Sequence, residues 1–194
     1  AQQLLVSVRT QGAERDEQGI SVVLIDAASS GVHKKAYTTV DGHRAAQISF
    51  TDVRVPVANC LGAEGEALSA VRSVVDRATL CVSAEAVGAL DMLLQKTVEY
   101  SKTRKQFGTA IGTFQALQHR MADMFIECQL ARSIVVMAAM KLDSDLPDAE
   151  KARAVSAAKS RVGRAIRKVG QEAVQLHGGI GITNELDVGH LFKR

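Results

Sequence analysis

The sequence predicts an α+β fragment, in which part of an antiparallel β domain precedes an all-α, up-and-down four-helix bundle. Residues 1–62 hold short apolar, β-branched runs separated by polar, turn-prone stretches, which is typical of antiparallel strands. Residues 63–194 hold long apolar stretches with three- and four-residue spacing and short connections, which is typical of bundle helices. We therefore expect two domains, divided between residues 62 and 63.

In the first half, strands are expected at residues 4–8, 20–25 and 45–50, with 53–55 as a candidate fourth. A polar stretch from Thr10 to Gly19 separates the first two, and Pro56 ends the last. This spacing suits an antiparallel sheet or part of a barrel.

In the second half, helices are expected at about residues 64–101, from near Thr113 to 142, at about 148–177, and from near Asn184. The second carries a seven-residue apolar repeat that faces a partner helix, made of Leu117, Met121, Met124, Cys128, Ala131, Val135 and Ala138. The chain begins without Met and ends inside the fourth helix, so we expect a fragment truncated there.

Composition excludes several classes of protein. Apolar residues make up 46% and charged residues 23% of the 194, so the chain is not disordered, and its net charge of +3 is too small for an obvious nucleic-acid binder. No stretch approaches the run of about 20 uncharged apolar residues in a membrane span, and no secretory signal is visible. Three cysteines without metal spacing indicate a reducing compartment, which we take as the cytoplasm. No metal site, Walker-type loop or nucleophile elbow occurs.

The third expected helix has a basic run. Residues 151–170 hold seven basic side chains and no acidic one, opposite an apolar stripe. A solvated face is one interpretation, and a partner surface or a phosphate contact is the other. DNA binding is not expected, because no recognition-helix motif accompanies the run.

Two further segments have the chemistry of a ligand site. Arg104, Gln106 and Phe107 lie around a glycine turn and suit a flat, anionic ligand, although cations there also complement a helix dipole. After the third helix, Gln175 and His177 precede Gly178 and Gly179, whose backbone a phosphate can approach closely. The alternative for this second segment is a helix cap and turn, and its glycine spacing is not a dinucleotide fingerprint.

Taken in order, these segments resemble the acyl-CoA dehydrogenases, flavin enzymes that desaturate acyl-CoA thioesters. The resemblance rests on Asp41-Gly42, on residues 48–56 and 61–65, on the run from Tyr100 to Gly108 with Phe114-Gln115 and residues 121–124, and on Gln175 to Gly181 with Glu185. It covers nearly the whole chain.

The resemblance implies that residues 1–62 are the later part of a middle β domain and residues 63–194 a C-terminal bundle. It also implies non-covalent FAD at a subunit interface. By position, the FAD-binding residues are Arg104, Gln106, Phe107, Phe114, Gln115, Gln175, His177, Gly178 and Gly179.

The implied reaction is α,β-desaturation, with a carboxylate that removes the α proton. In most of the family this base lies beyond the position of Arg194, and a minority place it where this chain has Ala78, which cannot serve. Thr79 stands where many members have Arg, so no catalytic residue is assigned, and Asp76 is a substrate-side candidate only.

The implied partners are an acyl-CoA substrate, a second copy in a homodimer or homotetramer, and electron-transferring flavoprotein as acceptor. The departures at Ala78 and Thr79 leave an alternative, a non-catalytic partner subunit or helical assembly module of a mixed oligomer. We expect the fragment alone to be inactive.

Overall fold

The computed structural model describes residues 2–40 and 42–193. They divide into two compact units, one up to Val74 and one from Val75 onward, and each is described by itself. The α+β fold expected from the sequence is confirmed: short antiparallel strands are followed by four α-helices. Arg194 and Asp41 of the resemblance lie outside the described residues.

The first unit contains a three-stranded sheet. Strand β1 (Gln3–Arg9) pairs antiparallel with β2 (Ile20–Asp26), with Val6 opposite Val23, and β5 (Cys60–Leu61) adds to the other edge of β2. The two long strands agree with the expected ranges.

The second hairpin differs in part from expectation. Strand β4 (Arg44–Phe50) was expected, whereas its partner β3 (Val32–Thr38) was not. Five of the seven β3 residues are polar or aromatic and all but Val32 are exposed, so the strand lacks the alternation that marks a half-buried one. The candidate strand at 53–55 is wrong: Asp52 has a φ of 51° and Pro56 caps the short 3₁₀ helix Val57–Asn59.

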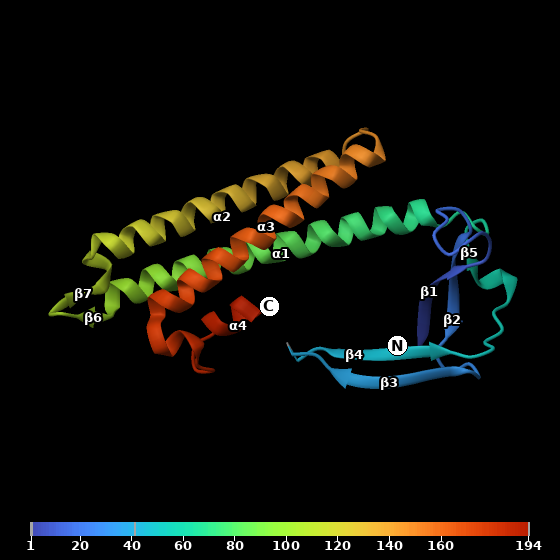
Figure 1. Cartoon of the computed structure of the whole chain (residues 1–194), viewed down its shortest axis with the longest axis horizontal. Helices are drawn as coiled ribbons and strands as arrows, with labels where there is room; N and C mark the ends of the chain where they lie inside the picture. The colour runs from blue at the N-terminus through green and yellow to red at the C-terminus, as the bar shows by residue number, and fades with distance from the viewer. Residues whose placement is uncertain (1, 41, 194) are drawn as a thin grey trace. The chain divides into compact units, whose positions relative to one another are not determined.

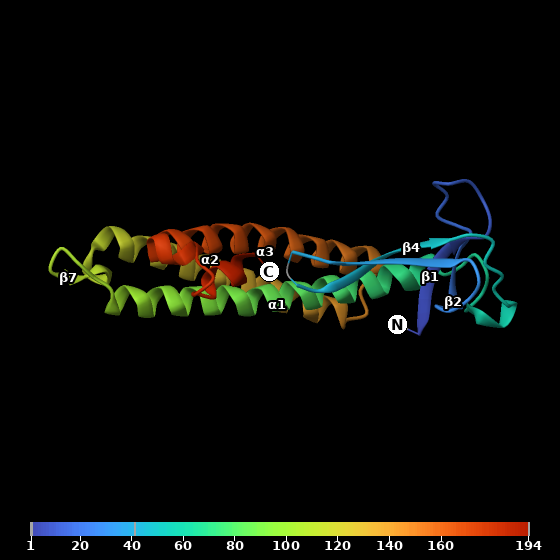
Figure 2. The same cartoon turned by 90° about the horizontal axis from the view of Figure 1, so that it is seen from below.

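The bundle is built from α1 (Leu68–Thr103), α2 (Gln115–Leu142), α3 (Asp148–His177) and the short α4 (Val188–Lys193). The first three lie side by side and alternate in direction, and α4 returns along α3 (Figures 1 and 2). The third range agrees with the expected one. The fourth helix begins later than Asn184, because a 3₁₀ helix, Gly178–Ile182, and a turn come first.

Apolar residues of all four helices form the bundle core, to which α4 adds Val188. Leu90 and Leu93 of α1, Met124 of α2 and Val169 of α3 have no exposed surface. The expected seven-residue repeat of α2 is confirmed as the buried face from Met124 to Ala138, and its first two members are partly buried. Truncating Leu90 to Ala therefore leaves a cavity that costs about 2–5 kcal/mol.

Among the described residues, α1 is the one helix that could cross a membrane by length and composition, with a mean hydropathy of 1.3 in its most apolar window. About a fifth of that window, 22%, is buried within the chain. Core helices of water-soluble proteins pass the same test, and α1 supplies Leu90 and Leu93 to the bundle core. The expectation that no segment spans a membrane stays a prediction.

Candidate functional site

A tight hairpin joins α1 to α2 at one end of the bundle (Figure 1). Strands β6 (Lys105–Gln106) and β7 (Thr109–Ala110) pair antiparallel, with Gln106 opposite Thr109. The two turn residues, Phe107 and Gly108, have φ values of 54° and 79°, as a two-residue turn between twisted strands requires. The expected glycine turn is therefore the tip of a hairpin.

Phe107 is held in an unfavourable and exposed position. A bulky side chain at positive φ is a genuine backbone outlier, because its Cβ crowds the neighbouring peptide. The ring is also 93% exposed. It meets the ring of Phe114 edge to face, with centroids 6.1 Å apart. Strain of this kind is concentrated at functional sites, and the structure brings these two predicted site residues together.

Arg104 has a fixed backbone and an uncommitted side chain. Its N–H donates to the carbonyl of Tyr100 and its own carbonyl accepts from Ile111 N–H, both at 2.8 Å. Its guanidinium is exposed, and no ion pair within the described residues involves it. A guanidinium so placed is available for a phosphate or carboxylate. Gln106 and Gln115, the first residue of α2, are exposed as well.

The glycine turn closes α3. Gly178 has a φ of 67° and donates its N–H to the carbonyl of Gln175, so that N–H already has a partner. The expectation that both glycines offer N–H groups to a phosphate needs this correction at Gly178. A Cβ built at Gly178 or Gly179 meets no heavy atom within 4 Å, so a ligand can approach the turn. Gln175 is exposed beside it.

His177 connects the glycine turn to the end of α1. Its ring is 4% exposed and stacks on Tyr100 of α1, with centroids 4.5 Å apart and planes at 29°. Its Nδ1 lies 2.8 Å from the carbonyl of Ala173, and because a carbonyl only accepts, Nδ1 carries the proton. His177 therefore holds the glycine turn against the end of α1 that leads into the hairpin.

Asp76 lies apart from these residues. It is half-buried on α1, 28 residues before Arg104, which at 1.5 Å per residue is about 42 Å along the helix. Ala78 is exposed and Thr79 is half-buried near it. The structure therefore does not bring the substrate-side candidate together with the hairpin and the glycine turn.

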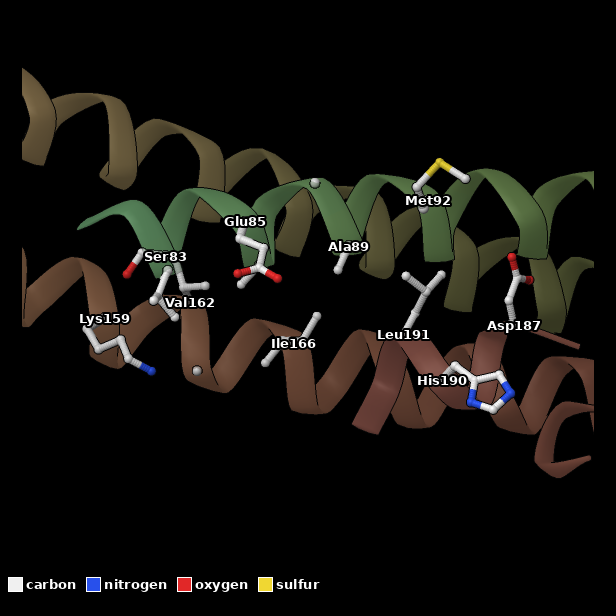
Figure 3. Close-up of a pocket in the computed structure, with 14 residues that line it drawn as sticks. Ser83, Glu85, Ala89, Met92, Lys159, Val162, Ile166, Asp187, His190 and Leu191 are labelled. Carbon is white, nitrogen blue, oxygen red and sulfur yellow. The ribbon is translucent and has the colours of Figure 1, made fainter. Parts of the chain in front are cut away.

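A groove of about 600 Å³ lies between α1 and α3 and is bounded at one end by the turn before α4 and by α4 itself (Figure 3). The space stays open because three residues that line it are small, namely Gly88, Ala89 and Gly163. Glu85 and Lys159 point into one end, and Asp187 and His190 lie at the other. The sequence patterns did not predict this groove, although the small residues Gly88, Ala89 and Gly163 on two long helices are a signal for it.

The basic run of α3 is used in part within the bundle. Arg161 and Lys168 both bind the carboxylate of Glu127 on α2, at 2.6 and 3.2 Å. Burial opposes ionisation of Glu127, but the hydrogen bonds from Arg161 and Lys168 outweigh it and hold its pKa below the ordinary value. Arg153, which belongs to the same run, is exposed. The solvated-face interpretation is thus incomplete.

Over residues 2–40 and 42–193, no three His, Cys, Asp or Glu side chains gather as a metal site would require. The chemistry of the bundle end is instead an exposed cation, two rings in edge-to-face contact and an open glycine turn. This set defines a helical protein suited to a flat anionic ligand.

Comparison with known proteins identifies the family. The family model for the acyl-CoA dehydrogenase C-terminal domain matches residues 65–194. The chain therefore belongs to the acyl-CoA dehydrogenase family, whose general activity is FAD-dependent catalysis.

Individual relatives and solved structures point to the same family. The acyl-CoA dehydrogenase IpdE2 of Mycobacterium tuberculosis is 40% identical over 131 residues, which are 68% of this chain and 39% of IpdE2. Butyryl-CoA dehydrogenase of Megasphaera elsdenii matches with a TM-score of 0.89 at 29% identity, covering 100% of this chain and 50% of its own. A structure of PigA with FAD and proline matches with a TM-score of 0.91 at 27% identity, covering 99% and 50%. The chain thus spans about half the length of these relatives.

Proposed function

We propose that this chain is the C-terminal part of an FAD-dependent acyl-CoA dehydrogenase that desaturates an acyl-CoA thioester between its α and β carbons. The observation that carries the proposal is the bundle end, where strained Phe107 and free Arg104 are linked by the stacked pair Tyr100 and His177 to an open glycine turn. Family membership supports the reaction class.

The residues of this end fit the cofactor. Arg104 supplies a forked cation for a phosphate, Phe107 and Phe114 supply an apolar wall for a flat ring, and Gly179 leaves room for close approach. Gln106, Gln115 and Gln175 offer exposed amides around them. We propose that the hairpin and glycine turn together bind FAD at the interface of two copies, in a homodimer or homotetramer. The structure of PigA with FAD supports this choice of ligand.

When bound, FAD accepts a hydride from the β carbon of the substrate. The chain's own contribution here is to hold and orient the cofactor. A carboxylate must remove the weakly acidic α proton in a site that excludes water. Ala78 offers none, so we propose that the base lies outside residues 1–194, and that electron-transferring flavoprotein reoxidises the enzyme. Its free cysteines suit a reducing compartment, which we propose is the cytoplasm.

The experiment is a flavin-retention measurement on the intact protein that contains this chain. Arg104→Ala removes a charge-assisted contact, so FAD affinity should fall by about 1.5–3 kcal/mol, roughly 10- to 150-fold. Arg153→Ala, an exposed arginine of α3, is the matched control and should leave affinity unchanged. Equal flavin content in both variants would refute the role of Arg104, and a colourless protein that takes up no FAD would refute the function.

A second candidate is a non-catalytic partner subunit, favoured by Ala78 and Thr79 on α1. Addition of acyl-CoA to the intact flavoprotein separates the two. Bleaching of the yellow flavin supports the dehydrogenase. A flavin that stays oxidised with every acyl-CoA tested, although FAD is bound, supports the partner subunit.

A further inference from the structure

The β6–β7 hairpin is too short to hold its own strained turn. Each strand has two residues, and two residue pairs join the strands. A two-stranded hairpin by itself is only marginally stable in water. Phe107 nevertheless keeps a φ of 54° at the tip of this one. Strain of this kind persists only where the surrounding structure fixes the backbone, so residues outside the two strands must hold the hairpin.

The base of the hairpin is fixed by the segment that follows it. This segment is the short 3₁₀ helix Ile111–Thr113, which leads from β7 into α2. The N–H of Ile111 donates to the carbonyl of Arg104 at 2.8 Å, and the Thr113 hydroxyl donates to the carbonyl of Ala110 at 2.7 Å. The shape of the hairpin therefore depends on where the 3₁₀ helix lies.

Gly112, the middle residue of this 3₁₀ helix, is held between α1 and α2. The side-chain amide of Gln118, near the start of α2, donates to the carbonyl of Gly112, with 2.8 Å between Nε2 and O. On the α1 side, Ser101 lies so close that a Cβ built at Gly112 meets its carbonyl oxygen and its Oγ at 3.0 Å. Ser101 is 4% exposed, and its Oγ donates to the carbonyl of Val98. The 3₁₀ helix thus has a hydrogen bond on one side and a tight contact on the other.

We propose that Gln118 is a positioning residue of the flavin site and acts through Gly112 on the strained turn at Phe107. The inference rests on the proposed function, because it gives Gln118 a role in FAD binding without contact to FAD. The Gln118 amide holds Gly112 against Ser101, and this closes the base of the hairpin. With the base closed, Phe107 keeps its positive φ and its edge-to-face contact with Phe114. These two rings are the proposed apolar wall for the cofactor.

The role requires a hydrogen-bond donor at position 118. A carbonyl oxygen only accepts, so the side chain must present an N–H to Gly112. Methionine has nearly the length of glutamine and forms helices as well, but it has no donor. Lysine has donors on a stem that is long enough to reach the same carbonyl. Gln118→Met therefore removes the hydrogen bond, and Gln118→Lys supplies a donor again.

Titration of FAD into the intact protein that contains this chain tests the proposal. Gln118→Met should lower FAD affinity about 2- to 12-fold, the net effect of one hydrogen bond, and Gln118→Lys should recover it. Gln129→Met and Gln129→Lys, at an exposed glutamine farther along α2, are the matched controls and should bind FAD like wild type. A Gln118→Met variant as tight as Gln129→Met, or a Gln118→Lys variant as weak as Gln118→Met, would overturn the proposal.

A double-mutant cycle shows whether Gln118 acts through Phe107. Phe107→Gly removes both the ring and the backbone strain, because glycine adopts positive φ freely. FAD affinity should fall in this variant, and adding Gln118→Met should then lower it no further. The same loss from Gln118→Met with and without the Phe107 ring would mean that Gln118 acts by another route, and the proposal would fail.

Hydrogen exchange of the FAD-free protein keeps this test apart from that of the proposed function. The amides of residues 105–110 should exchange faster in Gln118→Met than in wild type or Gln129→Met. FAD binding together with unchanged exchange in Gln118→Met would overturn the role of Gln118 alone. A protein that takes up no FAD in any variant would refute the proposed function and, with it, the role of Gln118 in the flavin site.

Discussion

Tyr100 and His177 stack at 4.5 Å and thereby join the ends of two helices that are 77 residues apart in sequence. Tyr100 stands four residues before Arg104, and His177 directly precedes the glycine turn. The His177 ring is anchored on its own helix through the Ala173 carbonyl. The stack therefore sets the distance between the cation and the turn that we propose to bind one cofactor.

Replacing Tyr100 by Leu should loosen the contact between the hairpin and the glycine turn, while the proposed cofactor-binding residues themselves stay unchanged. Loss of an aromatic pair costs about 0.5–1.5 kcal/mol, so FAD affinity of the intact protein should fall about 2- to 12-fold. Tyr100→Phe keeps the ring and should bind FAD like wild type. Flavin titration gives the affinities, and hydrogen exchange of the β6–β7 hairpin reports its loosening. If Tyr100→Leu retains wild-type affinity and exchange, the stack has no positioning role.

The Glu127 carboxylate should make the free energy of unfolding depend on pH. Arg161 and Lys168 hold its pKa below the ordinary value of 4.5 against the effect of burial, so the ionised form stabilises the fold. This contribution is present above about pH 4.5 and is lost as the pH falls through the lowered pKa. Glu127→Gln should reduce the free energy of unfolding by about 1–3 kcal/mol at neutral pH, because it leaves Arg161 half-buried without its anion.

Urea titrations of wild type and Glu127→Gln at several pH values measure this effect. The gap between them should shrink toward acid pH. Glu99→Gln, at an exposed carboxylate of α1, is the matched control and should stay close to wild type throughout. A gap that is constant across the whole range would contradict the ionic origin of the effect.

Two of the cysteines, Cys81 and Cys128, should react at very different rates. Burial raises the pKa of the Cys128 thiol to about 11, and its S–H points to the carbonyl of Leu90. Cys81 is exposed on α1. At pH 8, iodoacetamide should therefore modify Cys81 quickly and Cys128 only after unfolding, which peptide mass spectrometry resolves by site. Modification of Cys128 as fast as Cys81 in the folded protein would show that α2 opens locally.

Sequence patterns predicted the helices better than the connections between them. The end of α3 at His177 followed from two glycines, and the buried repeat of α2 from its spacing. The hairpin at Phe107 was missed as a hairpin because a phenylalanine is an unusual choice at positive φ, where Asn or Gly is the signal. Strand β3 was missed because exposure on both faces removes the period of two.

The candidate site was predictable in its residue types and not in their contacts. Arg104, Phe107 and Gly178 were identified from local chemistry and from the family resemblance. The contacts depend on which helices become neighbours, as when His177 packs against Tyr100 and Arg161 binds Glu127. Such partners lie far apart in sequence, and a single helix pattern carries no information about them.

Two glycines of α3 should respond to alanine with opposite signs. At Gly163 a Cβ meets no heavy atom within 4 Å, whereas at Gly170 it lies 2.3 Å from Cδ2 of Phe192 on α4. Alanine lowers the entropic cost of forming a helix, so Gly163→Ala should stabilise the chain by about 0.5–1 kcal/mol. Gly170→Ala should destabilise the chain by about 1–3 kcal/mol, because the Phe192 ring must move away from the added methyl group.

Gly170→Ala in the Phe192→Ala variant separates the steric strain against the ring from the helix propensity of residue 170. With the ring removed, Gly170→Ala keeps only the helix-forming gain and should stabilise by about 0.5–1 kcal/mol. The coupling between positions 170 and 192 should therefore amount to about 1.5–4 kcal/mol in a double-mutant cycle followed by thermal or urea unfolding. Equal effects of Gly170→Ala with and without the Phe192 ring would mean that α4 does not rest on α3 through this glycine.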